Sequence, residues 1–260
     1  MKEKITVVKI GGAVLEQEES LNDFLNQFLK IEGKKVLVHG GGREATRLSE
    51  RLGIETRMVE GRRITDVDTI EIVTMVYGGS VNKRVVSMLQ ARGIDAIGLT
   101  GADGGIIRSD KRKPVNGIDY GFVGDVKKVK GARILEFIRV GMTPVIAPLT
   151  LGNDGQLLNT NADTIASEVA VALSEFADVE LVYCFEKPGV LRNPDDEASV
   201  LSVITTENYK SFVEEGVVTG GMIPKIDNAI QAIKRGVREV RITGIGRLSD
   251  KSAGTTITEK

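Results

Sequence analysis

The segment Val36-Leu37-Val38-His39-Gly40-Gly41-Gly42-Arg43-Glu44-Ala45 predicts a buried strand, a glycine turn and the start of a helix in immediate succession. A strand that leads directly into a helix is the repeating unit of a parallel sheet covered by helices. The first turn of such a helix offers N–H groups and a favourable dipole to an anion. Gly41 and Gly42 are therefore candidates for contact with an anionic ligand.

The same alternation of short apolar runs and longer helical patterns extends over most of the chain, which predicts an α/β fold. The predicted strands are residues 5–10, 35–38, 96–99, 143–147, 179–184 and 239–242. The predicted helices are residues 21–30, 43–52, 66–92, 132–140, 162–176, 207–214 and 225–234. Residues 101–130 predict hairpins on the sheet edge, and the turn at 153–156 predicts another. The polar tail, residues 250–260, is expected to fray in part.

Composition excludes several functional classes. The chain has 260 residues, a net charge of −1 and 41% hydrophobic residues, which is typical of a soluble globular protein. With no basic excess and few aromatic residues, nucleic acid is not an expected partner. The single Cys184 and the single His39 exclude an internal disulfide and a zinc cluster. Lys9 interrupts the apolar start and no run reaches membrane-spanning length, so no membrane contact and a cytoplasmic location are expected.

Two lysines stand next to glycine turns. Lys9 lies within the run Val7-Val8-Lys9-Ile10-Gly11-Gly12, and Lys225 ends the run Thr219-Gly220-Gly221-Met222-Ile223-Pro224-Lys225. Glycine lets a phosphate approach the backbone closely, and a lysine on a buried strand is costly unless it is paired or used. Together with the loop at 40–42, these turns favour the binding of a triphosphate for phosphoryl transfer. An edge lysine that reaches solvent, or a turn without a ligand, remains the alternative for each motif alone.

Two polar clusters could hold the second substrate. In the run Asn159-Thr160-Asn161-Ala162-Asp163, Asn161 is a plausible helix N-cap, and Asn159 could hydrogen-bond a substrate amide. Asp163 could hold the two lysines in position. Arg62 and Arg63 could clamp a carboxylate with two parallel hydrogen bonds, although a solvated arginine pair fits the spacing equally well.

Other enzyme classes fit less well. The glycine turn also matches the dinucleotide fingerprint, with Glu60 at a tolerable distance, but that fingerprint normally follows the first strand. The chain lacks the P-loop and protein-kinase motifs. A single histidine in a glycine turn disfavours a Ser-His-Asp triad. A silent binding or regulatory module remains a further alternative.

Taken together, the ordered motifs resemble the amino-acid-kinase family from Val7 to about Thr256. The resemblance rests on motifs at residues 9–12, 38–42, 61–65, 81–83, 98–105, 121–126, 159–163 and 220–225. It implies a three-layer αβα sandwich with an open, mainly parallel eight-stranded sheet. It also implies an N-terminal lobe, residues 1–175, for acyl-amino-acid binding and dimerisation, and a C-terminal lobe, residues 176–260, for ATP.

The resemblance is strongest to members that phosphorylate N-acylglutamates. It implies transfer of the γ-phosphoryl group of Mg-ATP to the γ-carboxylate of N-acetyl-L-glutamate in arginine biosynthesis, with N-succinylglutamate or another family substrate as the alternative. The implied catalytic residues are Lys9, Lys225, Asp163, Gly12 and Gly41. The implied substrate-binding residues are Gly41, Gly42, Arg63 and Asn159. The implied nucleotide-binding residues are Lys9, Gly11, Gly12, Glu186, Gly189, Gly221, Met222 and Lys225, with magnesium held by the phosphates and by no protein side chain.

Two stretches depart from the family pattern. Glu186, in the run from Cys184 to Leu191, stands where relatives carry an aspartate near the adenine, which bears on the nucleotide contacts. The run Tyr77-Gly78-Gly79-Ser80 is also atypical and bears on the acyl pocket. The resemblance further implies a homodimer through the helix at 66–92. Because Lys9 stands close to the start of the sequence, this homodimer is expected to be insensitive to arginine.

Overall fold

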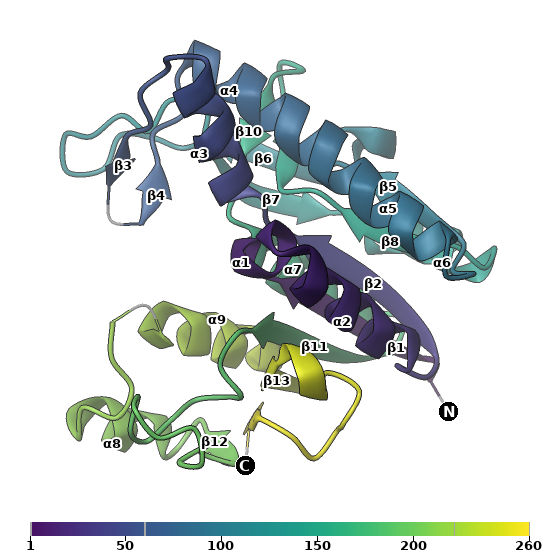
Figure 1. Ribbon diagram of the computed structural model, residues 1–260, viewed down its shortest axis with the longest axis vertical. Coiled ribbons are helices and arrows are strands. Elements are labelled where there is room, and N and C mark those ends of the chain that lie inside the picture. The colour runs from purple at the N-terminus through teal and green to yellow at the C-terminus, as the bar shows by residue number, and fades with distance from the viewer. Residues whose placement is uncertain (1, 60, 221, 260) are drawn as a thin grey trace. The chain divides into compact units, whose positions relative to one another are not determined.

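The computed structural model describes residues 2–59, 61–220 and 222–259, and it has mixed α/β structure (Figure 1). Eight strands form one sheet in the order β12-β14-β13-β11-β1-β2-β8-β5. Every strand pair with a described register in this sheet is parallel except β13 with β14. The prediction of an open, mainly parallel eight-stranded sheet is confirmed.

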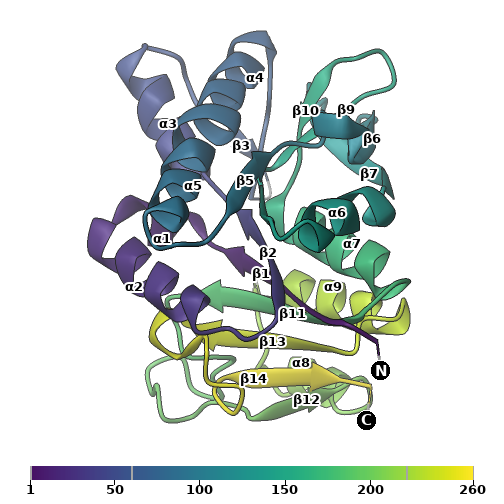
Figure 2. The ribbon, with the colours of Figure 1, turned by 90° about the vertical axis from the view of Figure 1, so that its right-hand side faces the viewer.

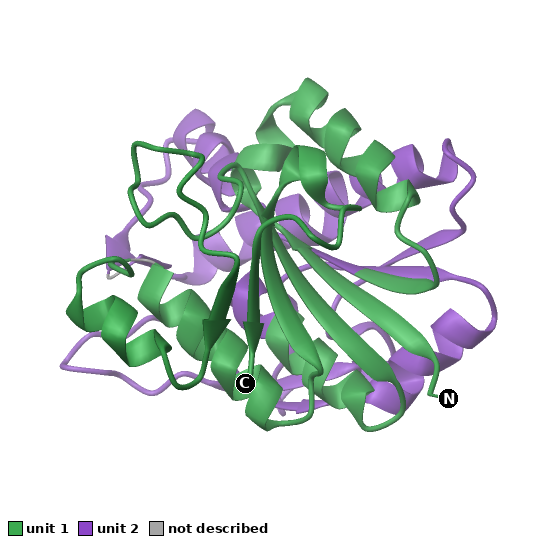
Figure 3. Cartoon of the chain, turned by 90° about the horizontal axis from the view of Figure 1, so that it is seen from below, with its two compact units in different colours: residues 1–36, 166–260 green, residues 37–165 purple. Residues whose placement is uncertain are grey.

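The chain divides into two compact units (Figure 3). Unit 1 contains the chain up to residue 36 and from residue 166 onward, whereas unit 2 contains residues 37–165. Strand β2 begins in unit 1 and ends in unit 2. The division of roles at residues 175 and 176 stays a prediction.

Unit 1 is built on five neighbouring strands, among which β11, β13 and β14 lie side by side in Figure 2. They are β12 (Val203–Thr205), β14 (Thr255–Thr258), β13 (Glu239–Gly244), β11 (Asp178–Phe185) and β1 (Lys4–Ile10). Its helices are α1 (Gly12–Glu16), α2 (Glu18–Leu29), α8 (Tyr209–Glu214), α9 (Met222–Lys234), the 3₁₀ turn η3 (Ile245–Arg247) and most of α7 (Ala162–Ser174). Every residue of β1 after Lys4 is buried, as expected for a strand covered on both faces.

The tail, which was expected to fray in part, is ordered at residues 255–258. These residues form β14, which pairs with β12 on one side and β13 on the other. Ile257 is fully buried, and the β-branched threonines on either side suit an extended chain.

Unit 2 contains β2 (Lys34–His39) from Leu37 onward, with β8 (Thr143–Ile146) and β5 (Ala96–Leu99), and a second sheet of its own. The second sheet has the order β10-β9-β6-β7, formed by β6 (Ile107–Lys111), β7 (Gly124–Val129), β9 (Leu149–Leu151) and β10 (Leu157–Asn159). The predicted hairpins β6–β7 and β9–β10 are therefore present. The hairpin within residues 101–130 was predicted on the edge of the main sheet, and this placement is wrong, because β6 and β7 belong to the second sheet. Unit 2 also contains β3 (Met58–Val59), β4 (Arg62–Arg63), α3 (Gly42–Arg51), the 3₁₀ turn η2 (Asp103–Gly105) and α6 (Gly131–Arg139).

The helix predicted over residues 66–92 is present as one continuous helix (Figure 1), and its middle segment is π-helical. It begins as α4 (Val67–Val73), continues as the π-helical segment η1 (Thr74–Val81) and ends as α5 (Asn82–Gln90). The side chain of Asp66 caps its start by accepting a hydrogen bond from the Thr69 N–H at 2.9 Å. A π-helical turn is uncommon and often marks a functional site. No helix within the described parts of the chain is long and apolar enough to cross a membrane.

Candidate active site

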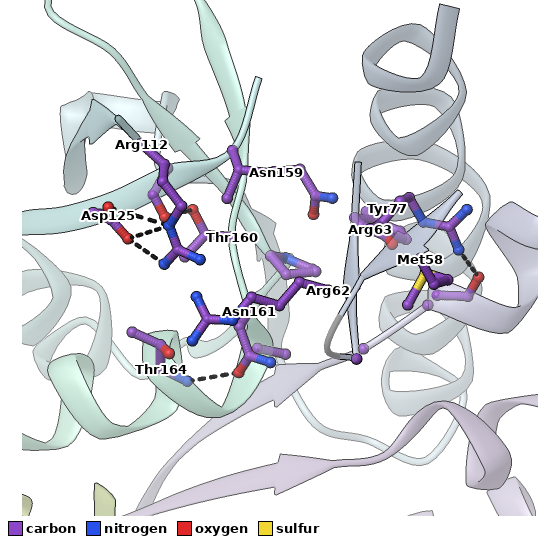
Figure 4. Close-up of a pocket in the computed structure, with 18 residues that line it drawn as sticks. Met58, Arg62, Arg63, Tyr77, Arg112, Asp125, Asn159, Thr160, Asn161 and Thr164 are labelled. Carbon is purple, nitrogen blue, oxygen red and sulfur yellow. Dashed lines mark hydrogen bonds and ion pairs between the residues drawn. The ribbon is translucent and has the colours of Figure 1, made fainter. Parts of the chain in front are cut away.

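A cavity of about 220 Å³ lies within unit 2 (Figure 4). It is lined by the glycine loop between β2 and α3, the β3–β4 hairpin, η1, and the segment from β10 into α7. Drug-sized ligands usually occupy pockets of about 300–1,000 Å³. The cavity therefore suits a small metabolite better than a whole nucleotide.

Arg63 is the buried cation of this cavity. Neighbouring residues of a strand point to opposite faces, so β4 buries Arg63 and exposes Arg62. The guanidinium of Arg63 donates hydrogen bonds to Thr56 Oγ1 at 3.1 Å, Thr46 Oγ1 at 2.7 Å and the Gly42 carbonyl at 2.8 Å. All three acceptors are neutral, so a bound carboxylate would supply the opposite charge. A solvated arginine pair does not describe Arg63.

Asn159 reaches the cavity from the end of β10. Its Nδ2 donates to Thr65 Oγ1 at 3.0 Å, which fixes the orientation of the amide. Figure 4 shows this amide extending toward the side of the cavity where Arg63 and Tyr77 lie. The prediction that Asn161 is an N-cap is confirmed, because its Oδ1 accepts hydrogen bonds from the N–H groups of Asp163 and Thr164. Asp163 is buried in the first turn of α7.

Tyr77 packs directly against the glycine loop. It is buried in η1, and burial raises the pKa of its hydroxyl. Gly41 has a φ of 156°, and a Cβ added there would lie only 2.7 Å from Cδ1 of Tyr77. Gly41 therefore has to be glycine for two reasons, its backbone conformation and the close approach of the ring.

We expect Gly41→Ala to lower kcat/KM for the acceptor at least about tenfold, because the loop or Tyr77 must move by several tenths of an ångström. Steady-state kinetics on the purified variant would measure this loss. Gly53→Ala is the matched control, because Gly53 also has a positive φ of 72° but open space around its Cβ position. That control should lose about 1 kcal/mol of stability and keep its kinetics. Equal kinetics in both variants would contradict the assigned role of the loop.

His39 is buried behind the glycine loop with both ring nitrogens engaged. Its Nδ1 donates to the Gly40 carbonyl at 2.6 Å, and its Nε2 accepts from Asn82 Nδ2 at 3.0 Å. The same Asn82 nitrogen donates to the Val145 carbonyl, so the amide cannot turn to accept from a protonated ring. Burial lowers the pKa of His39 to about 4. The ring is therefore a neutral support for the loop and does not act as a general base.

The pKa of His39 predicts a loss of stability in mild acid. Between pH 6.5 and pH 4 the unfolded chain binds this proton and the folded chain does not, so stability falls as the pH falls. From pH 7 to pH 5 this group should lower the free energy of unfolding by about 2 kcal/mol. Urea unfolding of the wild type and of His39→Gln at both pH values would measure the difference. An equal pH dependence in the two proteins would contradict the prediction.

Sequence reasoning missed Arg112 as a lining residue of the cavity. Its guanidinium binds the carboxylate of Asp125 through two nitrogens, as the dashed lines in Figure 4 mark. Arg112 follows β6 and Asp125 lies in β7, so the only cue was the common occurrence of charge pairs across a hairpin. Thr65 was also missed as a partner of Asn159, because the two residues lie far apart in the sequence.

The two predicted lysines meet at an aromatic ring in unit 1. Lys9 is the buried penultimate residue of β1, and Lys225 lies in the first turns of α9. The Nζ atoms of Lys9 and Lys225 lie 5.2 and 4.5 Å from the ring centroid of Phe185. Phe185 is the last residue of β11, which runs parallel to β1. Two ammonium groups, one from the end of β1 and one from α9, thus lie beside the ring at the carboxyl end of β11, which suits an anionic ligand.

The other nucleotide-binding candidates lie at the ends of unit 1 elements. Gly11 is the N-cap of α1 and Gly12 its first residue, while Met222 begins α9. Glu186 is exposed just after β11. Gly189 is buried, and a Cβ there would meet Val200 at 2.8 Å, so packing alone accounts for the glycine.

Gly221 lies outside the described residues. Cys184 is buried, and burial raises the pKa of its thiol to about 12, so it is not a reactive thiolate. Within residues 2–59, 61–220 and 222–259, no three His, Cys, Asp or Glu residues gather to hold a metal ion.

Residues 4–244 match the amino acid kinase family. An acetylglutamate kinase from Phocaeicola vulgatus is 57% identical over 257 residues, which cover 99% of each chain. The crystal structure of a protein from Streptococcus mutans is 31% identical, covers 98% of this chain and 99% of its own, and has a TM-score of 0.80. Carbamate kinase from Giardia lamblia bound to AMP-PNP has a TM-score of 0.71 with 99% of each chain covered, and at 15% identity it shares the fold alone. Since the match spans most of the chain and the similarity to the bacterial relative is nearly full-length, this protein belongs to the amino acid kinase family.

Proposed function

We propose that this chain transfers the γ-phosphoryl group of ATP to the γ-carboxylate of N-acetyl-L-glutamate, which forms an acyl phosphate and ADP. The observation that carries the proposal is the buried Arg63, whose hydrogen-bond acceptors named above are neutral, in a small cavity. The 57% identical relative named acetylglutamate kinase supports the choice of acceptor. The proposed reaction is a step in arginine biosynthesis.

The acceptor is assigned to the cavity of unit 2. Arg63 takes the α-carboxylate, and Asn159 and the loop at Gly41 and Gly42 take the neighbouring polar groups. The γ-carboxylate is ionised at neutral pH, so it attacks phosphorus without help from a general base. This chemistry is compatible with a neutral His39 whose two nitrogens are already hydrogen-bonded.

The phosphates of ATP are assigned to Lys9 and Lys225 and to the N–H groups of Gly11 and Gly12. The two ammonium groups stabilise the charge that develops on the transferring phosphoryl group, together with the Gly41 N–H. Asp163 orients the lysines. Glu186, Gly189, Gly221 and Met222 are the proposed contacts to the rest of the nucleotide. Magnesium, held by the phosphate oxygens, neutralises part of their charge when it is bound.

Hydroxylamine trapping tests the proposed reaction. Purified protein with Mg-ATP and N-acetyl-L-glutamate should form an acyl phosphate, which hydroxylamine converts to a coloured hydroxamate. Parallel reactions with N-succinylglutamate and with free glutamate test the choice of acyl group. No hydroxamate with N-acetyl-L-glutamate would refute the proposal, and product with N-succinylglutamate alone would reassign the acceptor.

We further propose a cytoplasmic homodimer that forms through the helix at residues 66–92. The apolar side chains of Val67 and Met75 are exposed on this helix, at 61% and 54%. Burial of such side chains would stabilise an interface between two copies. Sedimentation analysis should give a dimer for the wild type and a monomer for Met75→Glu, and a monomeric wild type would contradict the proposal.

A further inference from the structure

One aromatic ring contacts both of the lysines assigned to the phosphates. The ammonium groups of Lys9 and Lys225 each lie about 5 Å from the centroid of Phe185. A cation within about 6 Å of an aromatic face is attracted by the electron-rich ring. Phe185 therefore has the geometry of a double cation–π contact, and it comes from a strand that carries neither lysine.

The ring of Phe185 counteracts the repulsion between the two ammonium groups. Two ammonium groups that approach the same ring repel each other. Lys9 is buried on β1, and the backbone of that strand limits its movement. Lys225 is only partly buried on α9, so its side chain has more freedom. An attraction from Phe185 would hold both side chains in place before the nucleotide arrives.

Packing alone accounts for only part of the environment of Phe185. Its ring is half-buried, lies parallel to the ring of Tyr183 with a centroid distance of 6.3 Å, and approaches Gly11. Contacts of this kind need only an apolar side chain, which leucine also provides. Leucine has no electron-rich face, so only an aromatic ring at this position can attract the two ammonium groups.

We propose that Phe185 is a positioning residue, which uses its aromatic face to hold the ammonium groups of Lys9 and Lys225 where the phosphates bind. The inference rests on the proposed function, because that function assigns the two lysines to the phosphates of ATP. Phe185 precedes Glu186, in the stretch where this chain departs from the family pattern. The contact of Phe185 with both lysines thus assigns a physical role to a residue of this stretch.

Stepwise fluorination of the ring separates this electronic role from packing. Mono-, di- and trifluorinated phenylalanine incorporated at position 185 keep nearly the same volume while they weaken the negative face. We expect kcat/KM for ATP to fall with each fluorine, to about one tenth in the trifluorinated protein, while KM for N-acetyl-L-glutamate stays unchanged. Phe185→Tyr should keep the activity, and Phe185→Leu should match the trifluorinated protein.

Phe212 supplies the matched control. Its ring also carries a cation in unit 1, since the Arg192 guanidinium carbon lies 5.6 Å from its centroid. The same fluorination at position 212 should leave all kinetic constants unchanged. If Phe185→Leu equals the wild type, or if fluorination has no effect at position 185, the positioning role is refuted.

A binding measurement keeps this test independent of the proposed reaction. The dissociation constant of Mg·AMP-PNP, measured by calorimetry without an acceptor, should rise severalfold across the fluorinated series. A protein that binds this nucleotide but forms no hydroxamate would refute the proposed acceptor and still report on Phe185. Unchanged or tighter nucleotide binding in the trifluorinated protein would overturn the inference, because the ring would then be neutral or would compete with the phosphates.

Discussion

Replacing Lys225 by methionine is expected to lower kcat about a hundred- to a thousandfold. Methionine keeps an unbranched side chain of similar length and removes only the charge. The ammonium group is proposed to act on charge that develops as the phosphoryl group is transferred, so its loss should raise the barrier by about 3–4 kcal/mol. KM for N-acetyl-L-glutamate should change little, because that substrate is assigned to Arg63. Steady-state kinetics with each substrate varied in turn would measure both quantities.

Lys234→Met is the matched control for this prediction. Lys234 is exposed in the last turn of the same helix, α9. Its replacement by methionine therefore removes one positive charge from α9 without changing Lys225. The control should keep kcat within about twofold. Lys9→Met should lose about as much activity as Lys225→Met, and the double variant less than the product of the two losses, because both lysines act on one group. Full activity in Lys225→Met would remove this lysine from the mechanism.

The strands of the main sheet could be predicted because most of their residues are apolar. In β11, for example, every residue from Val179 to Cys184 is buried, and the sequence run covers the same residues. A continuous run of this kind is characteristic of a strand covered on both faces. Strand β14 was missed for the converse reason. Its threonines read as a polar tail, and only the pairing with β12 and β13 makes them part of the sheet.

The cavity shows the same limit of sequence reasoning. Arg62 and Arg63 are consecutive in the sequence, and the sequence does not show which of them is buried. The two-residue strand β4 decides the question, and no sequence pattern predicts a strand of that length. The sequence singled out Tyr77 only as part of an atypical Tyr-Gly-Gly-Ser run. Its contact with Gly41 depends on how η1 packs against the loop, which is a tertiary feature.

The sequence singled out the two lysines but not the ring that both of them contact. Glycine turns beside Lys9 and Lys225 indicated anion binding, because this property depends on local backbone and charge. The ring that both lysines contact could not be inferred in the same way. Phe185 stands at the end of an apolar strand, and nothing in its immediate neighbours distinguishes it from a core residue. Only the register of β1 with β11 and the position of α9 bring the three side chains together.

Replacing Arg63 by lysine is expected to raise KM for N-acetyl-L-glutamate about thirty- to a hundredfold. Lysine keeps the positive charge but loses the planar fork that binds a carboxylate through two parallel hydrogen bonds. Loss of a hydrogen bond to a charged group costs about 2–3 kcal/mol, which corresponds to this factor. KM for ATP should stay unchanged, because Arg63 is assigned to the acceptor. Initial rates over a wide range of acceptor concentrations would measure the change.

Arg62→Lys is the matched control, because Arg62 lines the same cavity from the exposed side of β4. An exposed cation is screened by water, so its replacement should change KM for the acceptor less than about threefold. Thermal unfolding separates binding from folding, since Arg63 also holds Thr46, Thr56 and the Gly42 carbonyl. A loss of stability with an unchanged KM would make Arg63 a structural residue. An increase of KM in Arg63→Lys alone would assign the α-carboxylate to the buried arginine, because the two residues differ in burial and not in charge.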